Sequence, residues 1–209
     1  MSILNEISEK LQAGKRKDVA QLCQQAIDEG IEAEVILKEG LLPGMDVVGT
    51  KFKANEIFVP QVLVAARAMA AGTEVLKAYL SDDNSSSKGK VVIGTVKGDL
   101  HDIGKNLVKM MMEGKGFEVI DLGNDVAPED FVQTAIDNDA KIICCSALLT
   151  TTMPVMGDVV KTAEEMGIRD KVKIMVGGAP VTESFAESIG ADAYTDDAAS
   201  AAEKALEYV

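Results

Sequence analysis

"KVVIGTVKGDLHDIGKN", residues 90–106, passes from an apolar, β-branched run to a polar loop and then to the start of a helical pattern. The run predicts a buried strand, and residues 103–115 predict the helix that follows it. The loop between them carries His101, the only histidine of the 209-residue chain. His101 lies between two glycines, with Asp99 and Asp102 on either side. The segment therefore indicates both the fold class of its half of the chain and the place to look for a site.

The alternation of strand and helix continues to the end of the chain. Such alternation predicts a parallel sheet covered by helices on both faces. Five strands in about 120 residues favour the flavodoxin-like, Rossmann-type α/β fold, a five-stranded parallel sheet with the strand order 2-1-3-4-5. The further strands are expected at FEVIDLG (117–123), KIICCSAL (141–148), KIMVGG (173–178) and ADAYT (191–195), with helices near 128–138 and 154–166, a short helix, and a final helix to Val209.

The first 80 residues show helical periodicity, which predicts an N-terminal all-α four-helix bundle. The polar, serine-rich SDDNSSSKGK (81–90) is typical of a linker, so we expect a helical domain at 1–84 and an α/β domain at 85–209. The helices are expected at SILNEISEKL (2–11), at DVAQLCQQAIDEG (18–30), from about Ala33 with a kink or interruption at LLPG (41–44), and within 56–80, where Pro60 lies near the first turn.

Composition and charge exclude several functions. The chain has 34 acidic against 21 basic residues, a formal net charge of -13 and no basic stripe, so nucleic-acid binding is not expected. The first ten residues are too polar for a secretory signal, and no apolar run approaches the ~20 residues of a membrane span. Cys23, Cys144 and Cys145 lack metal-ligand spacing and are expected to be small core residues. We therefore expect a cytoplasmic protein that binds neither nucleic acid nor a membrane.

The loop around His101 does not fit three familiar ligand-binding loops. A dinucleotide loop needs GxGxxG, and GTVKGDLHDIG (94–104) lacks that spacing. A Walker A loop needs four residues between Gly and Gly-Lys and then Ser or Thr, whereas here the spacer has five residues and asparagine follows the lysine. A phospho-acceptor receiver needs an aspartate at the end of the third strand, and CCSALL (144–149) has none.

Asp99 and His101 fit a different chemistry. A carboxylate two residues before an imidazole can accept a hydrogen bond from one ring nitrogen and make the other a better metal ligand. One histidine cannot build a protein-only zinc or iron site, which needs three or four ligands. It can supply one axial ligand to a metal that is already held in a macrocycle. The same residues also fit a loop histidine that caps the following helix, and this alternative stays open.

DLHDIG, 99–104, resembles the DxHxxG signature of cobalamin-binding proteins that hold the cofactor base-off with a protein histidine. Further along the chain, SALLTTT (146–152) resembles the S-x-L segment of that family, and VGGAP (176–180) its glycine pair. GLLPGMDVVGTKF (40–52) and EIFVPQVLVAARAM (56–69) resemble its helical cap. Together these cover nearly the whole chain, which is similar to the small corrinoid subunits of methyltransferase systems and to the corresponding modules of cobalamin-dependent methionine synthase.

The resemblance implies a role for each matching residue. His101 would be the lower axial ligand of cobalt, with Asp99 at its distal ring nitrogen. Thr152 would complete this triad where methionine synthase has a serine. Ser146 would meet the displaced nucleotide base, and Thr150 the corrin edge or the nucleotide tail. The implied cofactor-binding set is Gly98, Asp99, His101, Asp102, Ile103, Gly104, Ser146, Leu148, Thr150, Thr152, Gly177 and Gly178, and the cap candidates are Met45, Val48, Phe58 and Val59.

Ordinary structural roles are open for the same residues. The glycine pair at 177–178 fits a turn at the end of a strand, and the hydroxyls at 150–152 fit an N-cap of the next helix. Met45, Phe58 and Val59 also fit the core of the helical bundle.

The resemblance implies a methyl carrier and not an enzyme that turns over alone, since we find no substrate or acceptor module. The expected function is to carry a methyl group on cobalt from a substrate-specific methyltransferase to a second methyltransferase acting on tetrahydrofolate or coenzyme M. The implied cofactor is cobalamin or a related corrinoid (methylcobalamin, base-off and histidine-on), with a reductive-activation protein as a third partner. Methylamines, betaines, methanol and aromatic methyl ethers stay open as donors. One alternative is a cobalamin-binding regulatory or sensor module, which the acidic charge disfavours because such proteins usually add a DNA-binding domain. Another is the cobalamin domain of a mutase, which would not need the helical cap.

Overall fold

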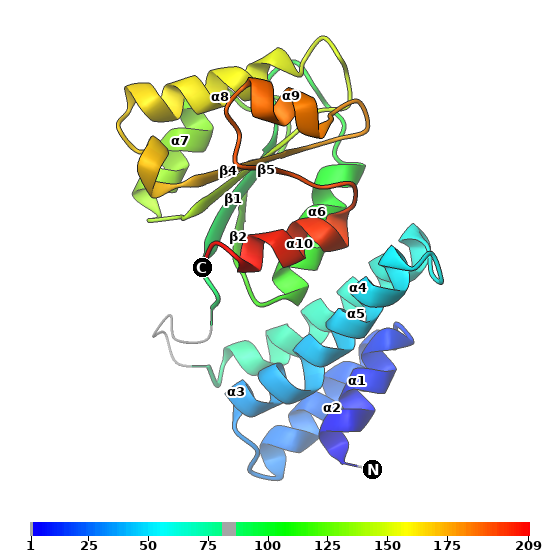
Figure 1. Cartoon of the computed structure of the whole chain (residues 1–209). Coiled ribbons are helices and arrows are strands. Elements are labelled where there is room, and N and C mark those ends of the chain that lie inside the picture. Colours follow the sequence, from blue (N-terminus) through cyan, green and yellow to red (C-terminus); the bar gives the residue numbers. More distant parts are fainter. Residues whose placement is uncertain (1, 81–86) are drawn as a thin grey trace. The chain divides into compact units, whose positions relative to one another are not determined.

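The computed structural model describes residues 2–80 and 87–209. It divides into two compact units (Figure 1). The helical unit holds the described residues up to Ser87 with Gly114–Gly116, and the α/β unit holds Lys88–Glu113 and Phe117–Val209. The boundary predicted between 84 and 85 lies outside the described residues. Within the described ranges, no helix combines the length and apolar character needed to cross a membrane.

The helical unit is a bundle whose helices bury one apolar face each. Ile7 and Leu11 of the first helix and Val19 and Cys23 of the second are fully buried. The last helix packs most extensively against the second. Gly72 of the last helix leaves no room for a side chain, because a Cβ would come within 3.0 Å of Val19 and 2.8 Å of Leu41. The helices are α1 (Ile3–Gln12), α2 (Arg16–Asp28), α3 (Ala33–Val35), the π-helix η1 (Ile36–Leu41), α4 (Leu42–Lys53) and α5 (Val59–Lys77).

The third helix is interrupted earlier than predicted, before Pro43 and not at LLPG (41–44). The chain forms the π-helical segment η1 between α3 and α4, and then resumes α-helical geometry at Leu42. Pro43 lies in the first turn of α4, where its missing N–H costs little. Pro60 occupies the same kind of position in α5, as the sequence predicts.

The α/β unit contains the predicted five-stranded parallel sheet, with the order β2-β1-β3-β4-β5. The fifth strand has only two residues, so the predicted strand at 191–195 is mostly loop. The elements are β1 (Lys90–Thr95), α6 (Ile103–Gly114), β2 (Glu118–Asp121), α7 (Pro128–Asp137), β3 (Ile142–Ser146), α8 (Pro154–Glu165), the 3-10 helix η3 (Arg169–Lys171), β4 (Lys173–Gly177), α9 (Glu183–Ser188), β5 (Ala193–Tyr194) and α10 (Ala198–Leu206).

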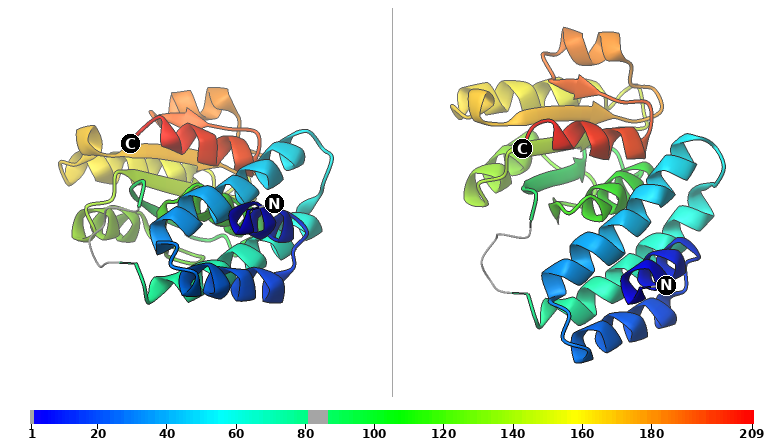
Figure 2. Two further views of the ribbon diagram at one scale, coloured as in Figure 1. Left: turned by 90° about the horizontal axis from the view of Figure 1, so that it is seen from below. Right: turned by 60° about the horizontal axis from the view of Figure 1, so that its bottom comes forward.

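Helices cover both faces of this sheet (Figures 1 and 2). On one face α7, α8 and α9 pack over a continuous apolar core that includes Phe131, Ile143 and Ile174. In the views of the two figures, α6 and α10 lie across the other face. Cys144 and Cys145 of β3 are both buried, which confirms them as core residues, and Cys145 belongs to the α7–α9 side.

Candidate cofactor-binding site

The predicted site residues of the α/β unit lie on loops at the carboxyl ends of its strands. The His101 loop follows β1, the 146–152 segment follows β3, and the glycine pair ends β4. Because β1 and β3 are neighbours at the point where the strand order reverses, these loops meet at the place where such sheets bind ligands.

Asp99 is the centre of the hydrogen-bond network at this place, and its side chain is fully buried. Its Oδ1 accepts from the backbone N–H of His101 at 3.0 Å and pairs with the ring Nδ1 of the same residue at 2.7 Å. Its Oδ2 accepts from the N–H groups of Leu148 and Leu149 at 2.7 and 3.1 Å. The hydroxyl of Thr152 donates to the same oxygen at 2.9 Å. The structure thus brings together the predicted Asp99, His101 and Thr152.

The network determines that Nδ1 of the His101 ring carries a hydrogen. Burial by itself would raise the pKa of Asp99, but the hydrogen bonds from the His101 and Leu148 amides, the imidazole and Thr152 outweigh it and hold the pKa well below its usual range. Since Asp99 is then ionised and can only accept, Nδ1 of His101 carries the hydrogen. The Nε2 atom makes no hydrogen bond to any described residue, and the side chain is 50% exposed. His101 therefore presents Nε2 to an open surface.

Exposed apolar side chains lie on the same two loops as His101 and the amides that bind Asp99. Leu100 and Ile103 are 72% and 75% exposed, and Leu148 and Leu149 are 44% and 41% exposed. Large aliphatic side chains at this exposure, clustered on two loops beside an imidazole, form a surface suited to a flat apolar ligand.

The two glycines at the end of β4 differ in the space around them. A Cβ on Gly177 would meet nothing within 4 Å, whereas a Cβ on Gly178, at a φ of +138°, would lie 1.8 Å from the carbonyl oxygen of Ala147. Gly178 is therefore required by the close approach of the β3 loop. Ser146, the last residue of β3, is half-buried and uses its carbonyl to accept from Val96.

The remaining predicted loop residues surround the start of α6 and the turn after β3. The carbonyl of Asp102 accepts from the backbone N–H of Asn106, and its carboxylate accepts from the side-chain amide of the same residue, so Asp102 is joined to the first turn of α6. A Cβ on Gly104 would point into open space, Gly98 has a φ of +85°, and Thr150 is exposed. These positions leave one side of the loop accessible.

The cap candidates belong to the helical unit. Met45 and Val48 are buried residues of α4, at 2% and 1% exposure. Phe58 is 61% exposed immediately before α5, and Val59 is half-buried at its first position. Their role as a cap stays a prediction.

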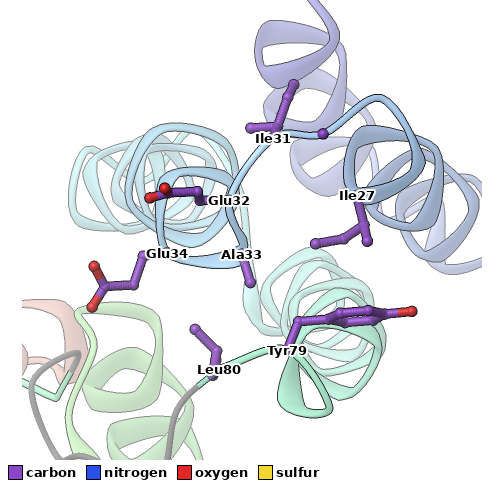
Figure 3. Close-up of a pocket in the computed structure, with 8 residues that line it drawn as sticks. Ile27, Ile31, Glu32, Ala33, Glu34, Tyr79 and Leu80 are labelled. Atoms are coloured by element: carbon purple, nitrogen blue, oxygen red, sulfur yellow. The ribbon is translucent and has the colours of Figure 1, made fainter.

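A pocket of about 460 Å³ also lies within the helical unit (Figure 3). Its walls include Ile27, Ile31, Glu32, Glu34 and Tyr79. The described residues that line it include none of the predicted site residues.

Two groups of polar residues that the sequence patterns did not single out lie beside the site. The turn after β2 holds the His101 loop through Asn124 and Asp125. Lys105 of α6 is only 3% exposed and donates to Asp121 at 2.6 Å. Burial alone would raise the pKa of Asp121, but the hydrogen bond from Lys105, with those of the Gly123 amide and Lys109, outweighs it and lowers the pKa. The Gly-Asn-Asp sequence (123–125) after the second strand is a turn signal at the carboxyl end of a strand, and it could have indicated the first of these groups.

The residues present fit a corrinoid. The Asp99-oriented imidazole offers one nitrogen, as an axial ligand must, and the exposed leucines and isoleucine beside it offer apolar contact to a macrocycle. The open side of Gly177 leaves room for an extended substituent of the ligand. The fold and site define a cobalamin-binding protein with a helical domain.

Comparison with known proteins agrees with this class. Residues 3–77 and 89–206 each match a family model described as a B12 binding domain. The chain is 42% identical over 205 residues to dimethylamine corrinoid protein 3 of Methanosarcina acetivorans, covering 98% of this chain and 96% of that one. It is 41% identical over 208 residues to a corrinoid protein of Desulfitobacterium hafniense, with the same coverage of 98% and 96%.

Among solved structures, the methanol:cobalamin methyltransferase complex of Methanosarcina barkeri matches with a TM-score of 0.89 at 32% identity, covering 97% of this chain and 78% of that one. This chain belongs to the B12-binding family of corrinoid proteins of methyltransferase systems.

Proposed function

We propose that this protein carries a methyl group on a corrinoid between two methyltransferases and does not turn over substrate by itself. The observation that carries the proposal is the Asp99–His101 pair, with Nδ1 bound to a buried carboxylate and Nε2 presented among exposed apolar side chains. The likeness to corrinoid proteins over nearly the whole chain supports it.

His101 would hold the cobalt of a corrinoid through Nε2, and the corrinoid would supply a metal that can accept and give up a methyl group. Asp99 keeps the hydrogen on Nδ1 of the imidazole, and Thr152 and the two leucine amides keep Asp99 ionised and fixed. Tight orientation by several donors means that the imidazole needs no rearrangement when it binds or releases the metal.

The other predicted residues would contact the rest of the cofactor. Ser146, Gly177 and Gly178 would line the groove for the nucleotide tail, where glycine allows close approach. Leu148 and Ile103 would contact the corrin ring through their exposed side chains. Gly98, Asp102, Gly104 and Thr150 would border the same surface.

We also propose that residues 1–84 form a cap over the methyl face and that residues 85–209 bind the cofactor. Met45, Val48, Phe58 and Val59 are the residues proposed for the cap. Shielding by apolar side chains would keep water from the reacting face until a partner docks.

The names of the relatives suggest the donor. The matched Methanosarcina acetivorans relative is named for dimethylamine, and the matched complex for methanol. We propose a methylated amine as the donor, loaded by its own methyltransferase, with methanol as the next candidate. A second methyltransferase acting on tetrahydrofolate or coenzyme M would unload the protein, and a reductive-activation protein would restore oxidised cofactor.

His101→Ala tests the ligand assignment. The variant should still bind cobalamin through the remaining contacts, but the nitrogen splitting from imidazole should vanish from the electron paramagnetic resonance spectrum of the Co(II) form. Added free imidazole should restore the splitting, because it can occupy the space of the missing ring. An unchanged spectrum in the variant would show that another group is the axial ligand.

The carrier role is tested with the methyltransferases separately. With the donor enzyme and dimethylamine alone, the reduced holoprotein should accept one methyl group per corrinoid and then stop. Sustained demethylation without an acceptor enzyme would contradict the proposal, and trials with methanol and its enzyme would identify the donor.

A further inference from the structure

The turn after β2, residues 123–125, is hydrogen-bonded to the backbone of the His101 loop. The side-chain amide of Asn124 donates to the carbonyl of Leu100 at 3.1 Å. The peptide before it is tied to β1, since the carbonyl of Gly123 accepts from the N–H of Thr95 at 2.9 Å. The turn is therefore hydrogen-bonded both to strand β1 of the sheet and to the His101 loop.

Asp125 makes two bonds to consecutive residues of the loop. Its carboxylate Oδ1 accepts from the N–H of Gly98 at 2.7 Å, and its own N–H donates to the carbonyl of Asp99 at 3.1 Å. Its φ is +56°, in the left-handed region that residues with a side chain rarely adopt. Asp125 adopts this conformation with its carboxylate directed at the loop, although glycine would fit the backbone more easily.

The bonds of this turn and the bonds of Asp99 constrain different parts of the loop. The Asp99 carboxylate ties the imidazole to the 148–152 segment, whereas the turn ties the backbone at residues 98, 99 and 100. The direction of Nε2 depends on both, because the torsions of the backbone carry the ring with them.

We infer that Asn124 and Asp125 are positioning residues for His101: they hold the loop backbone in the conformation that presents the ring nitrogen to a metal. This rests on the proposed function, in which His101 is the axial ligand. A ligand group that is already oriented loses little freedom on binding, and its apparent affinity falls with the fraction of molecules in the competent conformation.

The variants Asp125→Gly and Asn124→Ala test the inference. Asp125→Gly removes the carboxylate but keeps the positive φ unstrained, so the chain should fold. The chain offers a matched control for each. Asp139→Gly removes an aspartate with a φ of +51° whose carboxylate pairs with Lys141, and Asn138→Ala removes a side-chain amide that donates to the carbonyl of Thr134.

The first measurement is amide hydrogen exchange of the cofactor-free full chain. In both test variants, exchange within residues 98–101 should be about tenfold faster than in the unaltered protein, because the lost bonds no longer restrain the loop. The two controls should leave these amides unchanged. This measurement needs no assumption about the cofactor.

The second measurement is the Co(II) spectrum after loading with cobalamin. The test variants should bind the corrinoid, but the ratio of histidine-ligated to unligated cobalt should fall about tenfold. An unchanged ratio, or an equal fall in the two controls, would overturn the inference. If the unaltered protein shows no imidazole nitrogen at cobalt, the proposed function fails and the inference fails with it, even where exchange responds.

Discussion

Gly177 and Gly178 are adjacent at the end of β4, yet alanine should destabilise the protein at Gly178 and have little effect at Gly177. In Gly178→Ala the new Cβ would start 1.8 Å from the carbonyl oxygen of Ala147. To reach even 3.0 Å, the two atoms must separate by a further 1.2 Å or so, against backbone and at a φ of +138°.

The movement would reach the histidine site. The peptide that carries the Ala147 carbonyl also carries the N–H of Leu148, which donates to Asp99 at 2.7 Å. Backbone strain of about 1–3 kcal/mol and a weakened bond to a charged acceptor, worth about 1.5–3 kcal/mol, together give a loss of about 3 kcal/mol or more. For a unit of this size that corresponds to a melting temperature lower by about 10 °C.

Thermal unfolding of the cofactor-free full chain, followed by calorimetry, measures this loss. Gly177→Ala is the matched control, because its Cβ would meet nothing within 4 Å and its stability should stay within about 0.5 kcal/mol of the unaltered protein. If Gly178→Ala melts within about 2 °C of the control, the close approach of the two backbones is not the constraint on this residue.

Three further predictions concern other parts of the α/β unit. Asp121→Asn should lower the free energy of unfolding at pH 7, because it leaves the buried Lys105 without its carboxylate partner. Folding lowers the pKa of Asp121, so the difference in stability between variant and unaltered protein should shrink as the pH falls below the unfolded-state pKa of about 4. Denaturant titrations at several pH values measure this difference, and a difference that does not change with pH would refute the coupling of stability to the charge of Asp121. Thr152→Val should cost about 1.5–3 kcal/mol by removing a donor to Asp99, and Thr152→Ser should cost less; equal losses would mean that the methyl group matters and the hydroxyl does not. The fragment 88–209 should fold by circular dichroism and bind cobalamin; failure to bind would show that the helical unit contributes to binding.

Much of the fold was predictable because it depends on hydrophobic periodicity. The alternation of strands and helices in the second half correctly predicted a parallel sheet with this strand order, because that order is typical of such alternation, and the most apolar runs became the central strands β1, β3 and β4. The π-helical segment at Ile36–Leu41 was not predictable in kind, because an i→i+5 turn has no composition that differs from an α-turn. Ala193–Tyr194 shows the limit at the edge of the sheet, where one partner strand supports little pairing.

The site was predictable where side chains carry the chemistry. The pairing of Asp99 with His101 follows from their spacing, and Thr152 joins them as the family resemblance implies. The donors from Leu148 and Leu149 were hidden because backbone N–H groups leave no mark in a sequence. The binding roles of these residues stay proposals.

The rate at which the buried cysteines are labelled can measure local opening of the protein. Burial raises the pKa of Cys23 in the helical unit and of Cys144 in the α/β unit to about 12, so neither is a thiolate at neutral pH. A thiol-specific reagent can then modify a cysteine only while a local opening of the structure exposes it. The helical unit has one buried thiol and the α/β unit has two, so the labelling rates of their separate peptides would measure local opening of each unit independently, without any substitution in the chain.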